Sequence, residues 1–259
     1  METGRASKTA FSVARRRAVH QILDQPPVLC DPVAVPLLGP HFTYDRLKEA
    51  HPFARAFRAF MAMRSRYAED HLRAAADNGV GQYVVLGAGL DTFAYRNPLA
   101  NMRVFEVDFP ATQEWKRALL AEAGIALPAG LTFVPLDFEH KTLAAGLAEN
   151  GFDAEKPAFF SWLGVVPYLT LDAFRATLET IARLPAGTGV SFDYGVPRDS
   201  LSMVGRIAFD HLAARVAAAG EPFRLFFSPE ELNAMYFAGR ADGLKLPSQG
   251  MGRMATAWV

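Results

Sequence analysis

The sequence predicts an α/β fold, in which helices cover both faces of a mostly parallel, doubly wound sheet. Two observations carry this prediction. From residue 80 onward, short β-rich runs alternate regularly with amphipathic helical runs, a pattern typical of parallel βαβ units. The 79 residues before them show helical periodicity only. We therefore divide the chain into an N-terminal helical part, residues 1–79, and an α/β core, residues 80–259.

The composition excludes several classes of protein. Lys plus Arg (27) balances Asp plus Glu (27), so no global electrostatic field points to nucleic acid or to an anionic membrane. The single cysteine, Cys30, excludes an intrachain disulfide and a multi-cysteine zinc site, and it predicts a cytoplasmic protein without a metal. The most apolar segment, residues 158–171, is far shorter than the ~20 residues of a membrane span.

Two helices are expected in the N-terminal part, over residues 9–23 and 52–76. Three arginines at positions 15–17 interrupt the apolar stripe of the first, and we interpret them as a solvated helix face rather than as a nucleic-acid patch. In the second helix, Arg64 lies 11 residues after Phe53, about three turns on, and so projects from the centre of the apolar stripe. A guanidinium there needs an anionic or carbonyl partner, in the simplest case an acidic side chain in a structural ion pair.

Apolar, β-rich runs mark the strands of the core, and caps and breakers mark its helices. The expected strands are Tyr83 to Leu86, Arg103 to Val107, Leu131 to Val134, Ala158 to Trp162, Gly189 to Asp193 and a final strand, Ala255 to Val259. Pro110 suits the first turn of one helix, Thr170 can cap a second, and a third is expected from Leu201 to Ala219, with Gly220 beyond it.

The first expected strand leads into the turn Gly87-Ala88-Gly89. Glycines at this position let the backbone approach a ligand closely, although a merely tight turn would use them as well. The dinucleotide fingerprint requires a third glycine where Thr92 stands, to seat a pyrophosphate. The absence of this third glycine disfavours a nicotinamide-dependent oxidoreductase.

Acidic residues end the next two strands. Asp108 lies 21 residues beyond Gly87, where a carboxylate can accept hydrogen bonds from both hydroxyls of a ribose. Asp137 ends the third strand at the same sheet edge and can accept from an exocyclic amine such as adenine N6. Helix capping is the alternative role for either residue alone. Together with the glycine turn, the two aspartates indicate a nucleoside-like ligand.

Four ordered motifs give the chain a specific resemblance. They are GAGLDTFAYR (87–96), VFEVDFP (104–110), VPLDFE (134–139) and FFSWLGVVPYLT (159–170). In this order they resemble the leucine carboxyl methyltransferase-like family of S-adenosylmethionine-dependent methyltransferases, most of all its bacterial branch. The resemblance implies a Rossmann-like class I methyltransferase core beneath a helical lid, with S-adenosylmethionine as the cofactor. Gly87 and Gly89, with Ala88 between them, would line its methionine moiety.

The resemblance also implies roles for the charged residues. Asp108 would hold the ribose hydroxyls, and Asp137 with the backbone of Phe138 would bind the adenine. Arg64 matches the arginine of the family's Arg-x-Arg/Lys-aromatic segment and would bind the cofactor carboxylate, which would explain a charge on an apolar stripe. No catalytic residue is implied. The acceptor would be a carboxylate or hydroxyl of a small molecule or peptide, and the alternative is a non-catalytic cofactor-binding protein.

Two departures from the family pattern stand out. Leu163 occupies the position after the fourth strand where many relatives have a glutamate that faces the cofactor. Residues 227–232 and 233–237, which relatives separate by a helix and a strand, follow one another directly. We therefore expect that the sheet lacks the sixth strand of the family pattern, the one that relatives have between these two segments, and that the less protected edge favours a homodimer.

Overall fold

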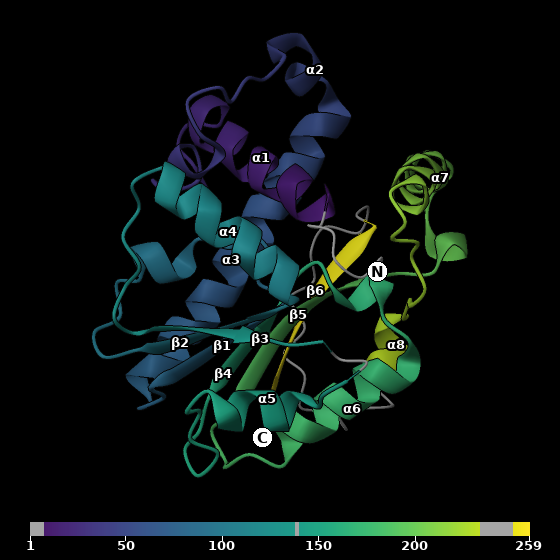
Figure 1. Cartoon of the computed structure of the whole chain (residues 1–259). Coiled ribbons are helices and arrows are strands. Elements are labelled where there is room, and N and C mark those ends of the chain that lie inside the picture. Colours follow the sequence, from purple (N-terminus) through teal and green to yellow (C-terminus); the bar gives the residue numbers. More distant parts are fainter. Residues whose placement is uncertain (1–7, 138–139, 234–250) are drawn as a thin grey trace.

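A computed structural model of the chain describes residues 8–137, 140–233 and 251–259. A single sheet, in the order β3-β2-β1-β4-β5-β6, lies between two layers of helices (Figure 1). Neighbouring strands are parallel except β6, which is antiparallel to β5. The predicted α/β fold with a mostly parallel, doubly wound sheet is confirmed.

The elements follow the predicted order. The strands are β1 (Gln82–Leu86), β2 (Arg103–Asp108), β3 (Leu131–Pro135), β4 (Phe159–Trp162), β5 (Gly189–Gly195) and β6 (Gly252–Trp258). The helices are α1 (Lys8–Leu23), α2 (Arg46–Ala50), α3 (Pro52–Asp77), α4 (Pro110–Glu122), α5 (Leu143–Glu149), α6 (Leu171–Ala182), α7 (Met203–Ala218) and α8 (Pro229–Leu232). Single 3₁₀ turns are η1 (Pro36–Leu38), η2 (Phe93–Arg96), η3 (Val166–Tyr168) and η4 (Arg198–Ser200).

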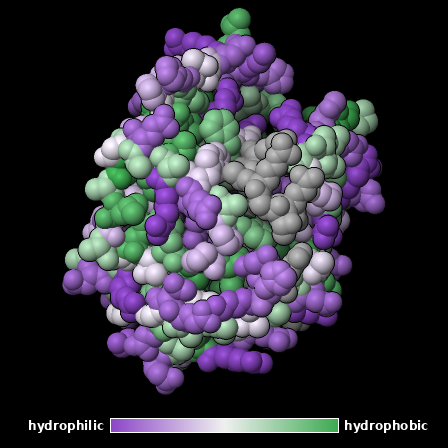
Figure 2. Space-filling model, viewed as in Figure 1, coloured by the Kyte–Doolittle hydropathy of each residue, from purple (hydrophilic) through white to green (hydrophobic). Residues whose placement is uncertain are grey.

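The two faces of the sheet carry separate apolar cores. Because side chains alternate along a strand, Val84 of β1 packs toward α5 and α6, whereas Val85 packs toward α3. All five residues of β1 are buried, as expected for a central parallel strand with helices on both faces. Polar side chains predominate at the upper and lower ends of the molecule in Figure 2, over α2 and along α5 and α6.

The arginines at positions 15–17 differ from the solvated face that was predicted. Arg17 is only 4% exposed, because it lies three residues after Ala14 on the buried stripe of α1. Arg15 is part-buried, and its Nη1 donates to Glu49 Oε1 over 2.7 Å. The interpretation as a solvated face was therefore wrong for Arg17.

The C-terminal part of the sheet ends in β6. This strand pairs with β5 over its whole length, from Gly195↔Gly252 to Gly189↔Trp258. Residues 234–250, between α8 and β6, lie outside the described residues, and they include all but the first residue of the segment 233–237. The loss of one strand there, and the homodimer that we expect to follow from it, stay predictions. Sedimentation of the purified protein tests the dimer.

None of the described helices combines the length and the apolar character that a membrane crossing requires.

Candidate functional site

The glycine turn after β1 is built from two left-handed residues. Gly87 has φ +64° and Gly89 has φ +48°, backbone angles that residues other than glycine rarely adopt. The turn is tied to β2, because Ala88 N donates to Val107 O over 3.0 Å. A Cβ atom on Gly87 would lie 2.4 Å from Val165 Cγ2, so glycine is also needed to let the loop after β4 approach the turn.

Asp108 ends β2 beside this turn. Its Oδ2 accepts from Gly89 N over 2.6 Å, and its Oδ1 accepts from Phe109 N over 2.7 Å. Burial raises the pKa of the Asp108 carboxyl above its usual value, although these backbone donors oppose the shift. A carboxylate has about four lone-pair positions, so the two backbone bonds and a hydrogen bond with the Thr112 side chain leave Asp108 able to accept about one more.

Asp137 follows β3 at the same edge of the sheet. Leu136 N donates to Asp108 O over 2.8 Å, which brings the ends of β2 and β3 together. Asp137 is half-buried, and its Oδ2 lies 3.9 Å from His140 Nε2. Phe138, the predicted adenine neighbour, lies outside the described residues.

Arg64 projects from α3 toward the ends of β4 and β5 and is 6% exposed, as its place on the apolar stripe predicted. Its Nη1 donates to Asp193 Oδ2 over 3.0 Å. Asp193 Oδ1 also accepts from Gly164 N over 2.5 Å. A Cβ atom on Gly164, which has φ +72°, would lie 2.8 Å from Arg64 Nη2, so the guanidinium lies directly against this glycine.

Asp193 was not predicted as a site residue, although it supplies the acidic partner that Arg64 needs. Its contact with the loop after β4 is made at Gly164, the residue that follows Leu163. A signal for it existed in the sequence, because Asp193 stands near the end of a strand, as Asp108 does.

A line of contacts thus joins the predicted residues along the carboxyl edge of the sheet. Arg64 contacts Gly164, the next residue Val165 reaches Gly87, and Gly89 contacts Asp108. Arg64 therefore approaches from the side of β4 and β5, whereas Asp108 and Asp137 lie on the side of β2 and β3.

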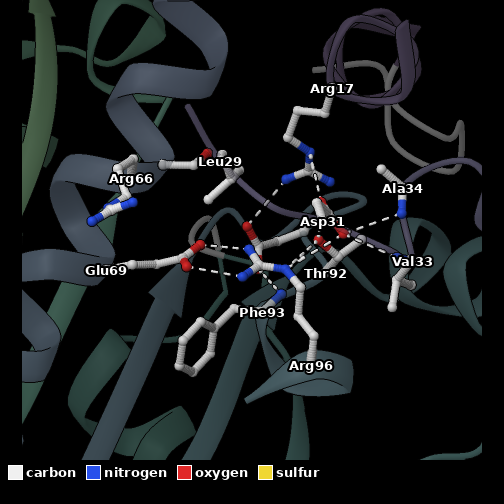
Figure 3. A network of polar contacts seen from close by, with 12 residues as sticks. Arg17, Leu29, Asp31, Val33, Ala34, Arg66, Glu69, Thr92, Phe93 and Arg96 are labelled. Atoms are coloured by element: carbon white, nitrogen blue, oxygen red, sulfur yellow. Dashed lines mark hydrogen bonds and ion pairs between the residues drawn. The ribbon is translucent and has the colours of Figure 1, made fainter. Parts of the chain in front are cut away.

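A buried polar network holds the segment after the glycine turn against the N-terminal helices (Figure 3). Asp31 lies at its centre, between Arg17 of α1 and Arg96 of η2. Thr92 Oγ1 donates to Asp31 Oδ2 over 2.6 Å, and Arg96 Nη2 donates to Glu69 Oε1 of α3 over 2.5 Å. Thr92, which replaces the third glycine of the dinucleotide fingerprint, therefore has a structural partner.

Arg17 extends the network to the turn itself. Its Nη2 donates to Leu90 O over 2.5 Å, and its Nη1 lies 3.3 Å from Asp91 Oδ2. Burial alone would raise the pKa of Asp91, but the positive charges of Arg17, Lys116 and Arg96 lower it below its usual value. The N-terminal helices and the glycine turn are thus positioned by shared charges.

A second buried pair lies beneath the site. Lys116 of α4 and Glu106 of β2 are each 1% exposed, and Lys116 Nζ donates to Glu106 Oε2 over 2.6 Å. Burial raises the pKa of Glu106 to about 7, and Lys116 opposes this shift. Within the described chain, Glu106 Oε1 and the Tyr95 hydroxyl are buried without a hydrogen-bond partner.

In the parts of the chain that the structure describes, no three His, Cys, Asp or Glu side chains are grouped as metal ligands would be.

Comparison with known proteins gives a family match and several relatives. Residues 10–182 match the family described as leucine carboxyl methyltransferase. YktD of Bacillus subtilis (strain 168) is 34% identical over 204 residues, which are 70% of this chain and 67% of the relative. A protein of Mycobacterium avium (strain 104) is 36% identical over 197 residues, 72% of this chain and 65% of the relative. Their names assign both provisionally to the S-adenosyl-L-methionine-dependent methyltransferases.

The aligned region covers a smaller share of some other relatives. For one from Mycolicibacterium smegmatis, it spans 57% of that protein's length. Solved structures share the fold. One from Thermobifida fusca YX, named provisionally as a methyltransferase, has a TM-score of 0.59 at 17% identity, over 98% of this chain and 95% of that one. A DUF574 family protein from Streptomyces avermitilis MA-4680 has a TM-score of 0.55 at 18% identity, over 86% of this chain and 94% of that one.

Proposed function

The chain belongs to the leucine carboxyl methyltransferase family, and from this membership we propose that it is an S-adenosylmethionine-dependent methyltransferase. The acceptor that we propose is an oxygen nucleophile, a carboxylate or a hydroxyl, on a small molecule or peptide. The observation that carries the proposal is the line of contacts from Arg64 through the glycine turn to Asp108, because it spans the strand ends at which ligands of such sheets bind.

The donor and acceptor groups at this edge suit the cofactor chemically. Asp108 keeps acceptor capacity for a ribose hydroxyl, and Asp137 follows the adjacent strand, on the side proposed for the adenine. Arg64 carries five N–H donors, of which Asp193 accepts one, so the guanidinium can also bind a carboxylate. The left-handed glycines Gly87 and Gly89 leave this turn without bulky side chains, which suits close approach of a ligand to backbone N–H groups.

The protein's contribution to the reaction is mainly positional. When bound, S-adenosylmethionine supplies an activated methyl group whose leaving group is a neutral thioether. The side chains of Arg64 and Asp108 would hold the two ends of the cofactor, and the helices of residues 1–79 would cover the acceptor and exclude water. Alignment of the acceptor oxygen with the methyl group is then the main source of rate.

The described residues favour a carboxylate acceptor over a hydroxyl. A carboxylate is already ionised and needs no base, whereas a hydroxyl needs one. Tyr168 and Tyr194 stand near the strand ends, but burial raises the pKa of Tyr168 to about 12 and also raises the pKa of Tyr194. Both phenols are therefore protonated at neutral pH and do not act as bases.

Calorimetry with S-adenosylmethionine, S-adenosylhomocysteine and NAD tests the proposal. We expect binding of the first two and none of NAD, and loss of binding in Arg64→Ala. A screen of carboxylate acceptors with methyl-labelled cofactor should then show label transfer. Tight binding of S-adenosylmethionine without transfer to any acceptor would favour the non-catalytic alternative, and specific binding of NAD would favour an oxidoreductase.

A further inference from the structure

Asp193 lies level with Asp108 near the carboxyl edge of the sheet. Asp108 follows Val107 of β2 by one residue, and Asp193 follows Phe192 of β5 by one residue. The register of the two strands between them puts Val107 and Phe192 in the same row. The pairs that establish this row are Leu86↔Val107, Val85↔Ser161 and Trp162↔Phe192. The two aspartates therefore stand at the same height along their strands.

Both aspartates also point to the same face of the sheet. Val107 and Phe192 belong to the apolar core that the sheet forms with α5 and α6. Because side chains alternate along a strand, Asp108 and Asp193 face the other side, on which α3 lies. In the order β2-β1-β4-β5 three spacings of about 4.8 Å separate the two strands, or about 14 Å. An extended ligand held by Asp108 thus points along the sheet edge toward Asp193.

Asp193 and Arg64 offer a ligand two opposite charges at one place. Arg64 Nη1 donates to Asp193 Oδ2 over 3.0 Å, and each side chain is 7% exposed. A ligand that reaches the guanidinium therefore also meets the carboxylate. Asp193 Oδ1 accepts from Gly164 N over 2.5 Å. These two contacts leave the carboxylate about two of its four lone-pair positions.

The two segments between Asp108 and Asp193 carry no acidic side chain of their own. The turn after β1 reads Gly87-Ala88-Gly89, and the loop after β4 begins Leu163-Gly164-Val165. The turn and the loop touch, since a Cβ atom on Gly87 would lie 2.4 Å from Val165 Cγ2. A ligand tail that runs over them toward Arg64 meets its carboxylate at Asp193.

We infer that Asp193 binds the α-ammonium group of S-adenosylmethionine, while Arg64 binds the carboxylate of the same amino-acid tail. The inference rests on the proposed function, because it adds a contact to that cofactor site. The ammonium and the carboxylate are attached to one carbon atom, so binding of the carboxylate by Arg64 holds the ammonium beside Asp193. Each charge of the tail then meets an opposite charge of the protein, and none is buried without a partner.

Calorimetry with two analogues of S-adenosylhomocysteine tests the inference. The deamino analogue has hydrogen in place of the ammonium group, and the decarboxy analogue has hydrogen in place of the carboxylate. The affinity for S-adenosylhomocysteine divided by that for the deamino analogue is the ammonium ratio, and division by that for the decarboxy analogue gives the carboxylate ratio. We expect an ammonium ratio of about thirtyfold in the wild-type protein, the effect of charge-assisted hydrogen bonds.

Asp193→Asn should lower the ammonium ratio to about fivefold, because a neutral amide oxygen replaces the carboxylate. The carboxylate ratio should not fall in this variant, since Arg64 is still present. A merely structural role of Asp193 would weaken the binding of all three compounds alike and leave both ratios unchanged. The two ratios therefore separate contact with the ammonium group from support of Arg64.

The double variant Arg64→Met/Asp193→Asn decides the matter if Asp193→Asn does not fold, because it leaves neither charge of the pair buried alone. Both of its ratios should be about fivefold or less, and ligand-observed NMR measures its weaker binding.

The matched control is Asp153→Asn. Asp153 also contacts one backbone donor and one cation, since its Oδ1 accepts from Glu155 N over 3.1 Å and its Oδ2 lies 3.0 Å from Lys156 Nζ. Its backbone N–H donates to the side chain of Gln82, the first residue of β1, which places Asp153 at the opposite edge of the sheet. Asp153→Asn should keep both wild-type ratios.

Three outcomes overturn the inference. The first is a wild-type ammonium ratio of about fivefold or less. The second is an ammonium ratio that stays near thirtyfold in Asp193→Asn or in the double variant. The third is an equal fall of this ratio in Asp153→Asn, because loss of any negative charge would then have the same effect. Failure of the wild-type protein to bind S-adenosylhomocysteine at all counts against the proposed function, and the inference falls with it.

Discussion

Replacement of the Arg64–Asp193 pair, one residue at a time and then together, separates its structural role from its role in binding. The two side chains are each 7% exposed and joined over 3.0 Å, so either charge left alone would be buried without its partner. Breaking such a pair costs about 3 to 5 kcal/mol. We expect about 3 kcal/mol for Asp193→Asn, because the asparagine oxygen can still accept from Gly164 N.

Arg64→Met should cost a similar amount, because it leaves the Asp193 carboxylate buried. The double variant contains neither charge and should be destabilised by only about 1 kcal/mol, since replacing both members of a buried pair is often close to neutral. Urea denaturation measures these values. With a slope of about 3 kcal/mol per molar urea, each single substitution lowers the midpoint by about 1 M.

Cofactor binding should respond in another way. The double variant regains most of the stability but lacks the guanidinium, so we expect it to bind S-adenosylmethionine at least about a hundredfold more weakly than wild type, the effect of a lost ionic contact of about 3 kcal/mol. Wild-type affinity in the double variant would refute the role of Arg64 in binding the cofactor. Additive losses of stability would refute the coupling between Arg64 and Asp193.

Three further predictions concern the turn and the acidic residues around it. Gly87→Ala should destabilise the protein by about 1 to 3 kcal/mol more than Gly124→Ala in urea denaturation, because both glycines have φ +64° but only the first would meet a neighbouring side chain. Affinity for S-adenosylmethionine should fall as the pH is lowered, because protonation of Asp108 removes an acceptor. The fall should begin at a higher pH than for an ordinary aspartate, because burial raises the pKa of Asp108. Calorimetry of Asp108→Asn should show weaker binding without this pH dependence. Lys116→Met should raise the pKa of Glu106 beyond about 7. A raised carboxyl pKa makes stability fall with rising pH up to the folded-state value, so this variant should lose up to about 1.4 kcal/mol per pH unit above neutrality, where the wild type is nearly flat.

Specific outcomes would contradict these three predictions. Equal losses in the two glycine variants would mean that the loop after β4 gives way to a methyl group. Identical pH profiles for Asp108→Asn and wild type would remove Asp108 from the binding equilibrium. An unfolding free energy of Lys116→Met that stays constant above pH 7 would show that Glu106 is already ionised in the folded variant, and that burial does not raise its pKa beyond about 7 when Lys116 is removed.

Much of the fold could be predicted because its signals are local. Each strand of the core is a short apolar run, and the cap at Thr170 is a side chain that bonds to the backbone three residues on. The candidate site followed from topology, because the ends of neighbouring parallel strands share one edge. Asp108 could therefore be placed beside the glycine turn without knowledge of its contacts.

The remaining part of the site depends on pairs that are distant in sequence. Arg64 and Asp193 are 129 residues apart, and Thr92 and Asp31 are 61 apart. No periodicity links such residues, so the sequence could show that Arg64 needs an anion but not which one. Arg17 was misread because three adjacent arginines look like a solvated patch, whereas the spacing from Ala14 to Arg17 already placed it on the buried stripe of α1.

The network around Asp31 has a consequence for how proteins of this kind can be recombined. Arg17 and Asp31 come from the N-terminal part, whereas Thr92 and Arg96 come from the segment that follows the glycine turn. An exchange of the first 79 residues with those of another family member would bring together charges that did not evolve to match. A working chimera must carry positions 92 and 96 along with the transplanted helices, so the unit that can be exchanged extends beyond the helical part.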